Sequence, residues 1–228
     1  MTAMVVACVC RFADCQQPDE ATIIRGVDAA VKARLDGIAD YTVTEHYAVY
    51  RGGDEVHAAA EMTVKTTYNR ETGKSYAILS ESGSAMLQKF VLNSILENEK
   101  RINEPGIREG SWLTSANYVM KLKPGGRERV NGRDCFVLSI DPRRKAPNLI
   151  IGTLWVDAAD GSIVQIKGTA SKSASAFTGP AEVMRQYTMI DGFAEATHAR
   201  AVAGSFLLGP TVVTIDYSGY RIDRTAPR

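Results

Sequence analysis

Hydrophobic residues recur at helical spacing near the start of the chain, between Glu20 and Ile38. The apolar positions lie three to four residues apart, and charged residues lie off that stripe. Asp19 stands just before the pattern begins, where its carboxylate suits a helix N-cap. We therefore predict an amphipathic helix over residues 20–38 that must pack against an apolar surface.

After Tyr41 the hydrophobic period changes to two, which is typical of strands with one buried and one solvated face. A glycine-rich turn at 51–54 separates this first strand from a long alternating segment at 56–68. A third strand is expected at 74–81. The pattern therefore predicts three consecutive strands after the first helix.

Ser84 precedes a second apolar segment with helical spacing. We predict a helix that Ser84 caps and that ends near Arg101, because Glu104-Pro105-Gly106 cannot continue it. From there to Asn117 the chain is expected to be irregular, with one helical turn.

From Tyr118 onward every signal indicates strands and turns, with tight hairpins predicted at Asn131-Gly132 and Asp160-Gly161. The expected strands are 118–123, 127–130, 134–141, 149–157, 162–169, 181–190, 196–206 and 211–221. The total is about eleven strands with two helices. This predicts an α+β, mostly antiparallel β fold, a strongly curved half-barrel with the helices covering its concave face.

The composition agrees with one globular unit. The chain has 228 residues, of which 45% are hydrophobic and 23% charged, which excludes a disordered chain. The net charge of +1 is not typical of nucleic-acid-binding domains, which are usually strongly basic. We expect a monomer with a single domain over 19–228, preceded by a residual signal or leader segment at 1–18.

Three of the four cysteines, Cys8, Cys10 and Cys15, crowd the start of the chain, so they do not form a disulfide framework. The short apolar segment Met4–Cys10 resembles the end of a secretory signal. Val5–Cys8 also resembles a lipobox, in which Cys8 would be lipidated. Three alternatives stay open: a truncated leader with unstructured cysteines, a lipid anchor at Cys8, or a metal site, although no fourth ligand lies nearby.

Residues that could carry catalysis are few. The chain contains no nucleophile-elbow, zinc-protease, Cys-x-x-Cys or P-loop motif. We expect His46 and His57 to face each other across a hairpin, without a carboxylate on the same side, while His198 lies far along the chain. Cys135 begins an apolar strand and is expected to be a buried, unreactive thiol. We therefore predict no enzyme activity, no cofactor and no metal site.

Positive charge is concentrated between Lys121 and Lys145, where eight basic residues stand against three acidic ones. Arg143, Arg144 and Lys145 form a predicted basic rim. The segment is either a solvated hairpin face or a contact for anionic lipid headgroups or an acidic partner. Nucleic acid is disfavoured, because no aromatic residues interleave with these charges to stack bases.

Apolar residues are numerous enough to line the concave face of the sheet and the helix over it. Wide sheets of this kind often enclose a cavity, although a normally filled core would show the same pattern. The candidate ligand-binding residues, in cavity and lid, are Tyr47, Met62, Val64, Leu87, Phe90, Val91, Ile95, Phe136, Leu138, Leu154 and Ile215.

Several segments resemble the outer-membrane lipoprotein-sorting (LolA/LolB-like) superfamily, most closely its uncharacterised bacterial branch. The order of a helix, three strands, a helical insertion and a strand meander matches that superfamily. The segments that carry the resemblance are Tyr41–Tyr47, Val130–Leu138, Asp141–Lys145, Leu154–Gly168 and Thr214–Ser218.

The resemblance implies a half-open barrel with a helical lid and a hydrophobic cavity for acyl chains of lipoproteins or other lipids. It also implies a location in the periplasm or on the periplasmic face of the outer membrane. Two functions follow as hypotheses: a non-enzymatic carrier or receptor for lipid, or an envelope scaffold with a filled core that binds a partner through its basic rim.

Overall fold

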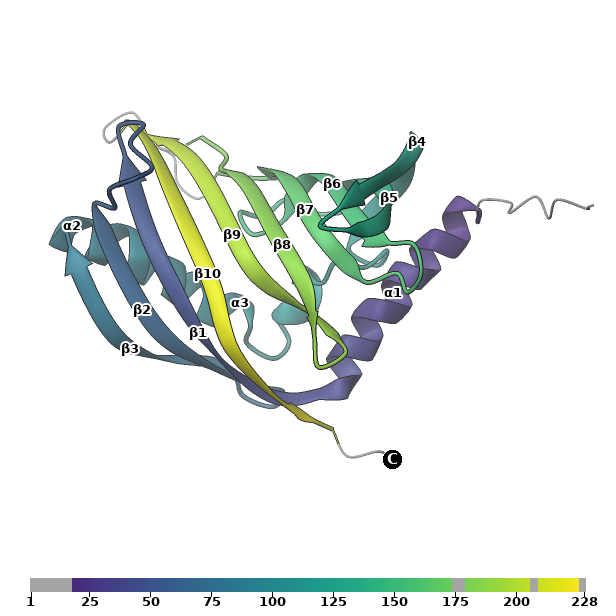
Figure 1. The fold of residues 1–228 in the computed structure, drawn as a ribbon, viewed down its shortest axis with the longest axis horizontal. Helices are drawn as coiled ribbons and strands as arrows, with labels where there is room; N and C mark the ends of the chain where they lie inside the picture. Colours follow the sequence, from purple (N-terminus) through teal and green to yellow (C-terminus); the bar gives the residue numbers. More distant parts are fainter. Residues whose placement is uncertain (1–17, 174–178, 206–208, 226–228) are drawn as a thin grey trace, which may run out of the picture.

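The computed structural model describes residues 18–173, 179–205 and 209–225, whose strands form one antiparallel, strongly curved sheet (Figure 1). The strands are β1 (Ile38–Arg51), β2 (Ala60–Asn69), β3 (Gly73–Gly83), β4 (Tyr118–Val130), β5 (Arg133–Pro142), β6 (Ile150–Asp157), β7 (Ile163–Ala170), β8 (Glu182–Ile190), β9 (Phe193–Ser205) and β10 (Gly209–Arg224). They lie in the order β3-β2-β1-β10-β9-β8-β7-β6-β5-β4. The two edges, β3 and β4, are not joined, which confirms the predicted half-barrel.

The ten strands in the described residues correct the expected number of about eleven. Residues 118–123 and 127–130 belong to one strand, β4, because the pairing with β5 only shifts register between Leu122 and Arg127. The intervening Pro124-Gly125-Gly126 is a bulge inside the strand. Its glycines give the same sequence signal as a turn, so the pattern alone could not distinguish the two.

The path of the chain explains why helices cover the concave face. β1 starts in the middle of the sheet, and β2 and β3 lead outward to one edge. The chain then crosses to the opposite edge at β4 and returns strand by strand to β10, which pairs with β1. All residues between β3 and β4 must therefore span the sheet, and they carry the second helical segment.

The first helix, α1 (Glu20–Gly37), confirms the prediction for residues 20–38. The Asp19 carboxylate accepts a hydrogen bond from the Thr22 amide at 2.6 Å, so it caps the helix as expected. Ile23 and Val27 are buried against the sheet. β1 follows the helix without a loop.

The second helical segment is continuous but irregular. It consists of α2 (Ala85–Leu87), the π-helical turn η1 (Gln88–Leu92) and α3 (Asn93–Ile102). The side chain of Ser84 makes no capping hydrogen bond, so that part of the prediction is wrong. The Gln88 amide instead donates to one backbone carbonyl of β2 and one of β3, each at 2.7 Å, which attaches the segment to both strands.

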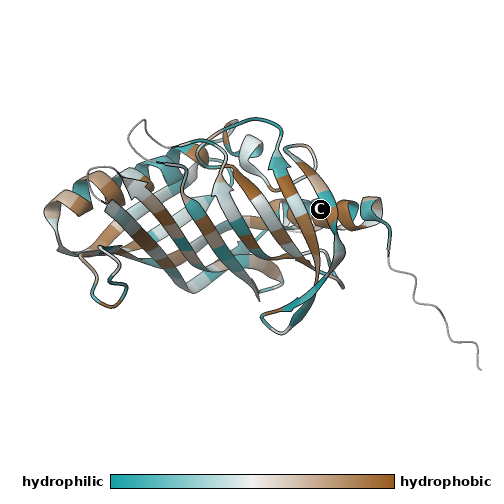
Figure 2. Ribbon diagram, turned by 90° about the horizontal axis from the view of Figure 1, so that it is seen from above, coloured by the Kyte–Doolittle hydropathy of each residue, from teal (hydrophilic) through white to brown (hydrophobic). Residues whose placement is uncertain are grey.

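Two apolar clusters fill opposite ends of the concave face, and Figure 2 shows the bands of apolar and polar residues that cross the sheet. The α1 cluster contains Ile23, Val27, Tyr118, Met120, Phe136, Leu138, Ile140, Leu149, Leu154, Val156 and Ile166. The α3 cluster contains Tyr47, Val49, Ala60, Met62, Val64, Leu87, Leu92, Leu96 and Val213. Each helical segment thus seals its own part of the sheet.

The segment after α3 bridges two strands that are distant in the sheet order. It includes the predicted helical turn, η2 (Arg108–Ser111). Arg108 donates to the Tyr68 hydroxyl of β2 at 3.2 Å and lies over its ring. Two residues later, the carbonyl of Gly110 accepts from Arg144, just beyond β5, at 2.8 Å. These contacts hold the two walls of the half-barrel near each other at one end.

Candidate functional site

One row of directly paired residues crosses the concave face through nine strands. The row runs Met62, Tyr47, Ile215, Ala199, Arg185, Ile166, Leu154, Leu138 and Leu122. Directly paired residues of antiparallel strands point to the same face, so all nine side chains share the concave side. The row is apolar at both ends, but in its middle it carries only Ala199 and Arg185.

The neighbouring row shows the same interruption. It runs Val49, Val213, Ala201, Val183, Gly168, Gly152, Ile140 and Met120. Its middle members are small, where a filled core would carry residues such as leucine or phenylalanine. We call the middle of both rows the central strip, which consists of Gly152, Gly168, Val183, Arg185, Ala199 and Ala201.

The central strip is more accessible than the clusters beside it. Apart from Ala199, which is 5% exposed, its members are all partly exposed. By contrast, Leu138 and Leu154 of the α1 cluster and Val64 of the α3 cluster have no exposed surface. The middle of the two rows is therefore less completely buried than the two apolar clusters on either side of it.

Backbone rather than side chains forms the floor of the strip at Gly152 and Gly168. A Cβ atom on Gly152 would lie 2.2 Å from the carbonyl oxygen of Lys167, and one on Gly168 would lie 2.2 Å from that of Ile151. Strands β6 and β7 therefore approach each other too closely here for any larger residue. Neither position can therefore carry a side chain without displacing the backbone of the neighbouring strand.

Arg185 is the charged member of the central strip. Its Nε is buried without a hydrogen-bond partner, and among the described residues it forms no ion pair within salt-bridge distance. Burial alone would lower the pKa of its guanidinium, but Tyr217, Tyr187 and Glu99 together raise it well above its ordinary value. The surroundings therefore favour the charged guanidinium, but its Nε remains a buried donor without an acceptor.

Polar contacts attach α3 to the edge strand β3. Lys74 lies 3.2 Å from the carboxylate of Glu99, and the Tyr76 hydroxyl donates to Glu97 at 2.7 Å. Burial opposes the charged form of Glu99, but Lys74 and, to a smaller extent, Arg185 outweigh this and lower the pKa of that carboxyl. The helix is thus held over the sheet by an ion pair as well as by the α3 cluster.

The residues predicted to line a cavity are divided between the two clusters. Tyr47, Met62, Val64 and Leu87 are buried in the α3 cluster, with Val91, Ile95 and Ile215 at its margin. Phe136, Leu138 and Leu154 are buried in the α1 cluster. Phe90 is 65% exposed and takes part in neither. These side chains are therefore not brought together around one site.

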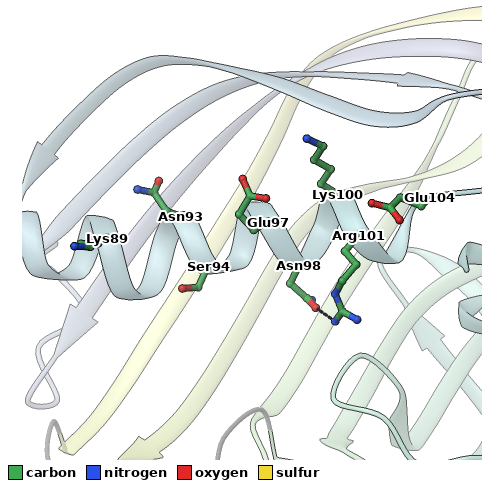
Figure 3. A pocket seen from close by; sticks show the side chains of 8 residues that line it. All are labelled: Lys89, Asn93, Ser94, Glu97, Asn98, Lys100, Arg101 and Glu104. Atoms are coloured by element: carbon green, nitrogen blue, oxygen red, sulfur yellow. Dashed lines mark hydrogen bonds between the residues drawn. The ribbon is translucent and has the colours of Figure 1, made fainter.

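A depression of about 640 Å³ runs along α3, but its lining is polar (Figure 3). It is lined by Lys89, Asn93, Ser94, Glu97, Asn98, Lys100, Arg101 and Glu104. All of these come from the second helical segment or the residues just after it. None belongs to the apolar set predicted from the sequence, so this depression is not the expected acyl-chain cavity.

Two members of the basic rim have structural partners. Arg143 donates to the carbonyl of Ser115 at 3.1 Å, and Arg144 donates to that of Gly110. Both carbonyls lie in the segment that joins α3 to β4. The side chains of Arg143 and Arg144 therefore hold that segment in place, while both residues and Lys145 are exposed.

The histidines do not lie as predicted. His46 is paired with Thr63 of β2 rather than with His57, and its Nε2 lies 3.4 Å from the carboxylate of Glu61. The expectation that no carboxylate shares its side was therefore wrong, because Glu61 lies on the neighbouring strand. His57 lies in the β1–β2 turn and contacts Asp54. In the described part of the chain, no group of histidines, cysteines and carboxylates could hold a metal ion.

Cys135 is buried, and its thiol donates to the Arg133 carbonyl. Burial raises the pKa of that thiol, which favours the unreactive protonated form. Cys8 and the expected leader up to residue 17 lie outside the described residues. No helix in the described ranges is long and apolar enough to cross a membrane.

Sequence reasoning missed the central strip. Its signal was available in two places: the alternating alanines of β9, and the glycines that stand inside the strands β6 and β7. Only the register of the sheet shows that these small residues from four strands meet on one face. Arg185 was missed because a single arginine in a strand normally points to solvent.

No protein-family model and no curated protein sequence matches the chain. A solved LolA superfamily protein from Nitrosomonas europaea is 12% identical, with a TM-score of 0.48, covering 91% of this chain and 94% of its own. A lipoprotein-sorting protein domain from Vibrio parahaemolyticus is 14% identical, with a TM-score of 0.46 and coverages of 86% and 91%. A DUF1329 family protein from Desulfovibrio piger is 16% identical, with a TM-score of 0.43 and coverages of 88% and 93%.

Proposed function

We propose that residues 19–228 form one domain that carries or receives a lipid acyl chain on its concave face, without enzyme activity. The observation that carries this proposal is the central strip: small side chains in the middle of the sheet, partly exposed, between two sealed apolar clusters. A fully filled half-barrel would carry large side chains at these positions.

The chemistry of the strip suits a hydrocarbon chain. Ala199, Ala201 and Val183 offer apolar surface, and the two glycines allow close approach to the backbone. Each methylene moved from water onto such a surface contributes about 0.8 kcal/mol. The α1 and α3 clusters on either side would give the chain apolar walls.

The proposed location is the cell envelope, in the periplasm or on the periplasmic face of the outer membrane. A carrier there would keep acyl chains out of water between membranes. The support for this location is the secretory-like segment Met4–Cys10, together with the proposed affinity for acyl chains.

Binding of a fluorescent fatty-acyl probe, 11-(dansylamino)undecanoic acid, to the delipidated chain tests the proposal. We expect Ala201→Trp to abolish binding, because the indole would fill the strip. Val64 and Leu138 are unsuitable for this test, since both are completely buried and a substitution there would disturb the core.

The matched control is Lys167→Trp, at an exposed residue of β7 next in sequence to concave Ile166 and therefore on the opposite face. It should bind the probe as the unaltered chain does. No binding by the unaltered chain, or unchanged binding by Ala201→Trp, would contradict the proposal and favour an envelope scaffold with a filled core. Circular dichroism of each variant shows whether it has folded.

A further inference from the structure

Arg185 places a positive charge on a surface that is otherwise apolar, and a hydrocarbon chain alone would not require that charge. The guanidinium stays charged at every physiological pH, and a buried charge is normally paired with an opposite charge. Among the described residues no carboxylate lies within ion-pair distance of Arg185, and its Nε is buried without an acceptor. An unsatisfied donor of this kind is destabilising unless a ligand provides the acceptor.

Two carboxylates that influence Arg185 or its neighbour Tyr217 already have hydrogen-bond partners. Glu99 is paired with Lys74 at 3.2 Å, and buried Glu45 accepts a hydrogen bond from the Tyr47 hydroxyl. Glu99 also favours the charged form of Arg185, but neither carboxylate lies within ion-pair distance of it. The largest favourable influences on the Arg185 charge come from Tyr217 and Tyr187, whose hydroxyls carry no negative charge at neutral pH.

Arg185 and Tyr187 are two residues apart on β8, and their side chains interact through a hydrogen bond. Across the sheet, Arg185 is paired with Ala199 of β9, and Ala199 is paired with Ile215 of β10. Tyr217 of β10 is close enough to influence the Arg185 charge. A planar guanidinium with adjacent hydroxyl donors is a suitable receptor for a carboxylate, which accepts two hydrogen bonds side by side.

We propose that Arg185 binds the carboxylate of a single-chain amphiphile, such as a long-chain fatty acid, whose hydrocarbon chain lies along the rest of the central strip. This inference rests on the proposed function and adds the class of ligand. Val183, Ala201 and the two glycines of the strip continue away from Arg185 on the same face. A single cationic side chain, Arg185, beside an apolar strip is complementary to a ligand with a single carboxylate and a single hydrocarbon chain.

Competition for the dansyl probe by three ligands of equal chain length tests the inference in the full chain. The ligands are palmitate, methyl palmitate and hexadecanol, of which only palmitate carries a carboxylate. We expect the unaltered chain to bind palmitate roughly ten- to a hundredfold more tightly than the other two, as a charge-assisted hydrogen bond provides. Arg185→Met should remove that preference and leave the binding of hexadecanol unchanged.

Arg200→Met is the matched control. Arg200 lies on the adjacent strand β9, next in sequence to Ala199, so its side chain points to the opposite face of the sheet. There it forms an ion pair with Glu55. It should keep the preference for palmitate. Equal affinities for the three ligands in the unaltered chain, or a preference that survives Arg185→Met, would overturn the carboxylate anchor while the acyl-binding function stands. Failure of the unaltered chain to bind any of them would overturn both. The comparison of ligands in the unaltered chain decides the question even if Arg185→Met does not fold.

Discussion

Arg34 of α1 and Glu195 of β9 form a bidentate ion pair, although 161 positions separate them in the sequence. The Arg34 Nε and Nη2 atoms donate to the two carboxylate oxygens at 2.8 and 2.7 Å. Glu195 is only 2% exposed, so Arg34 provides most of the compensation for a buried charge. This pair fixes the end of α1 against strand β9.

Arg34→Ala should lower the free energy of unfolding by about 3 kcal/mol, because it leaves the Glu195 carboxylate buried without a partner. Urea denaturation followed by circular dichroism measures this. Lys32→Ala is the control, since the Lys32–Asp36 pair is exposed and its loss should cost less than about 0.5 kcal/mol. Similar values for the two variants would show that the Arg34–Glu195 pair has no special role.

The Lys74–Glu99 pair should make the attachment of α3 depend on pH. Against the effect of burial, Lys74 and Arg185 lower the pKa of Glu99 below its ordinary value of 4.5, so the stabilisation is fully present above that pH. It is lost as the pH falls through the lower pKa of the folded chain, where Glu99 becomes protonated. Glu99→Gln should therefore destabilise the chain by about 1 kcal/mol at pH 7 and by much less at low pH. Urea midpoints of both chains across this range test the sign, and a difference that does not change with pH would contradict it.

Gly152→Ala should destabilise the sheet by about 1–3 kcal/mol, because its Cβ would collide with the backbone of β7. Thermal unfolding measures the effect. Gly204→Ala, in β9, is the matched control: a Cβ there meets nothing within 4 Å, so its stability should stay within about 0.5 kcal/mol. A tolerated alanine at Gly152 would mean that the two strands can separate and that the floor of the strip is adaptable.

Arg144→Ala should loosen the segment that joins α3 to β4, because it removes the hydrogen bond to the Gly110 carbonyl. We expect the amides of η2 to exchange hydrogen roughly five- to tenfold faster, as the loss of about 1 kcal/mol of local stability implies. Lys145→Ala should leave that exchange unchanged. Equal effects of the two substitutions would indicate that the basic rim acts through its charge alone.

Local pattern was sufficient for most of the secondary structure. The stripe that includes Ile23 and Val27 predicted α1, and the period-two alternation of β1 and β2 predicted which side chains are buried, because each depends only on near neighbours in the sequence. The bulge in β4 was not recognised, since Pro124-Gly125-Gly126 satisfies the rules for a turn equally well.

The candidate site was beyond what local pattern could determine. Hydrophobicity correctly placed large residues such as Leu138 and Val64 on the concave face of the sheet. In the structure, however, these residues fill two separate apolar clusters. A binding surface depends on positions with small side chains as much as on positions with large ones. Within a single strand, an alanine or glycine does not show whether it belongs to such a surface.

Chain order and hydrophobic period therefore decided the elements of this protein and the faces they bury, because those properties are set by backbone geometry within a few residues. Only the tertiary structure decided where those faces meet. The register across β6, β7, β8 and β9 brings Gly152, Gly168, Ala201 and Arg185 to the middle of one concave face, and register depends on hydrogen bonds between strands distant in the sequence.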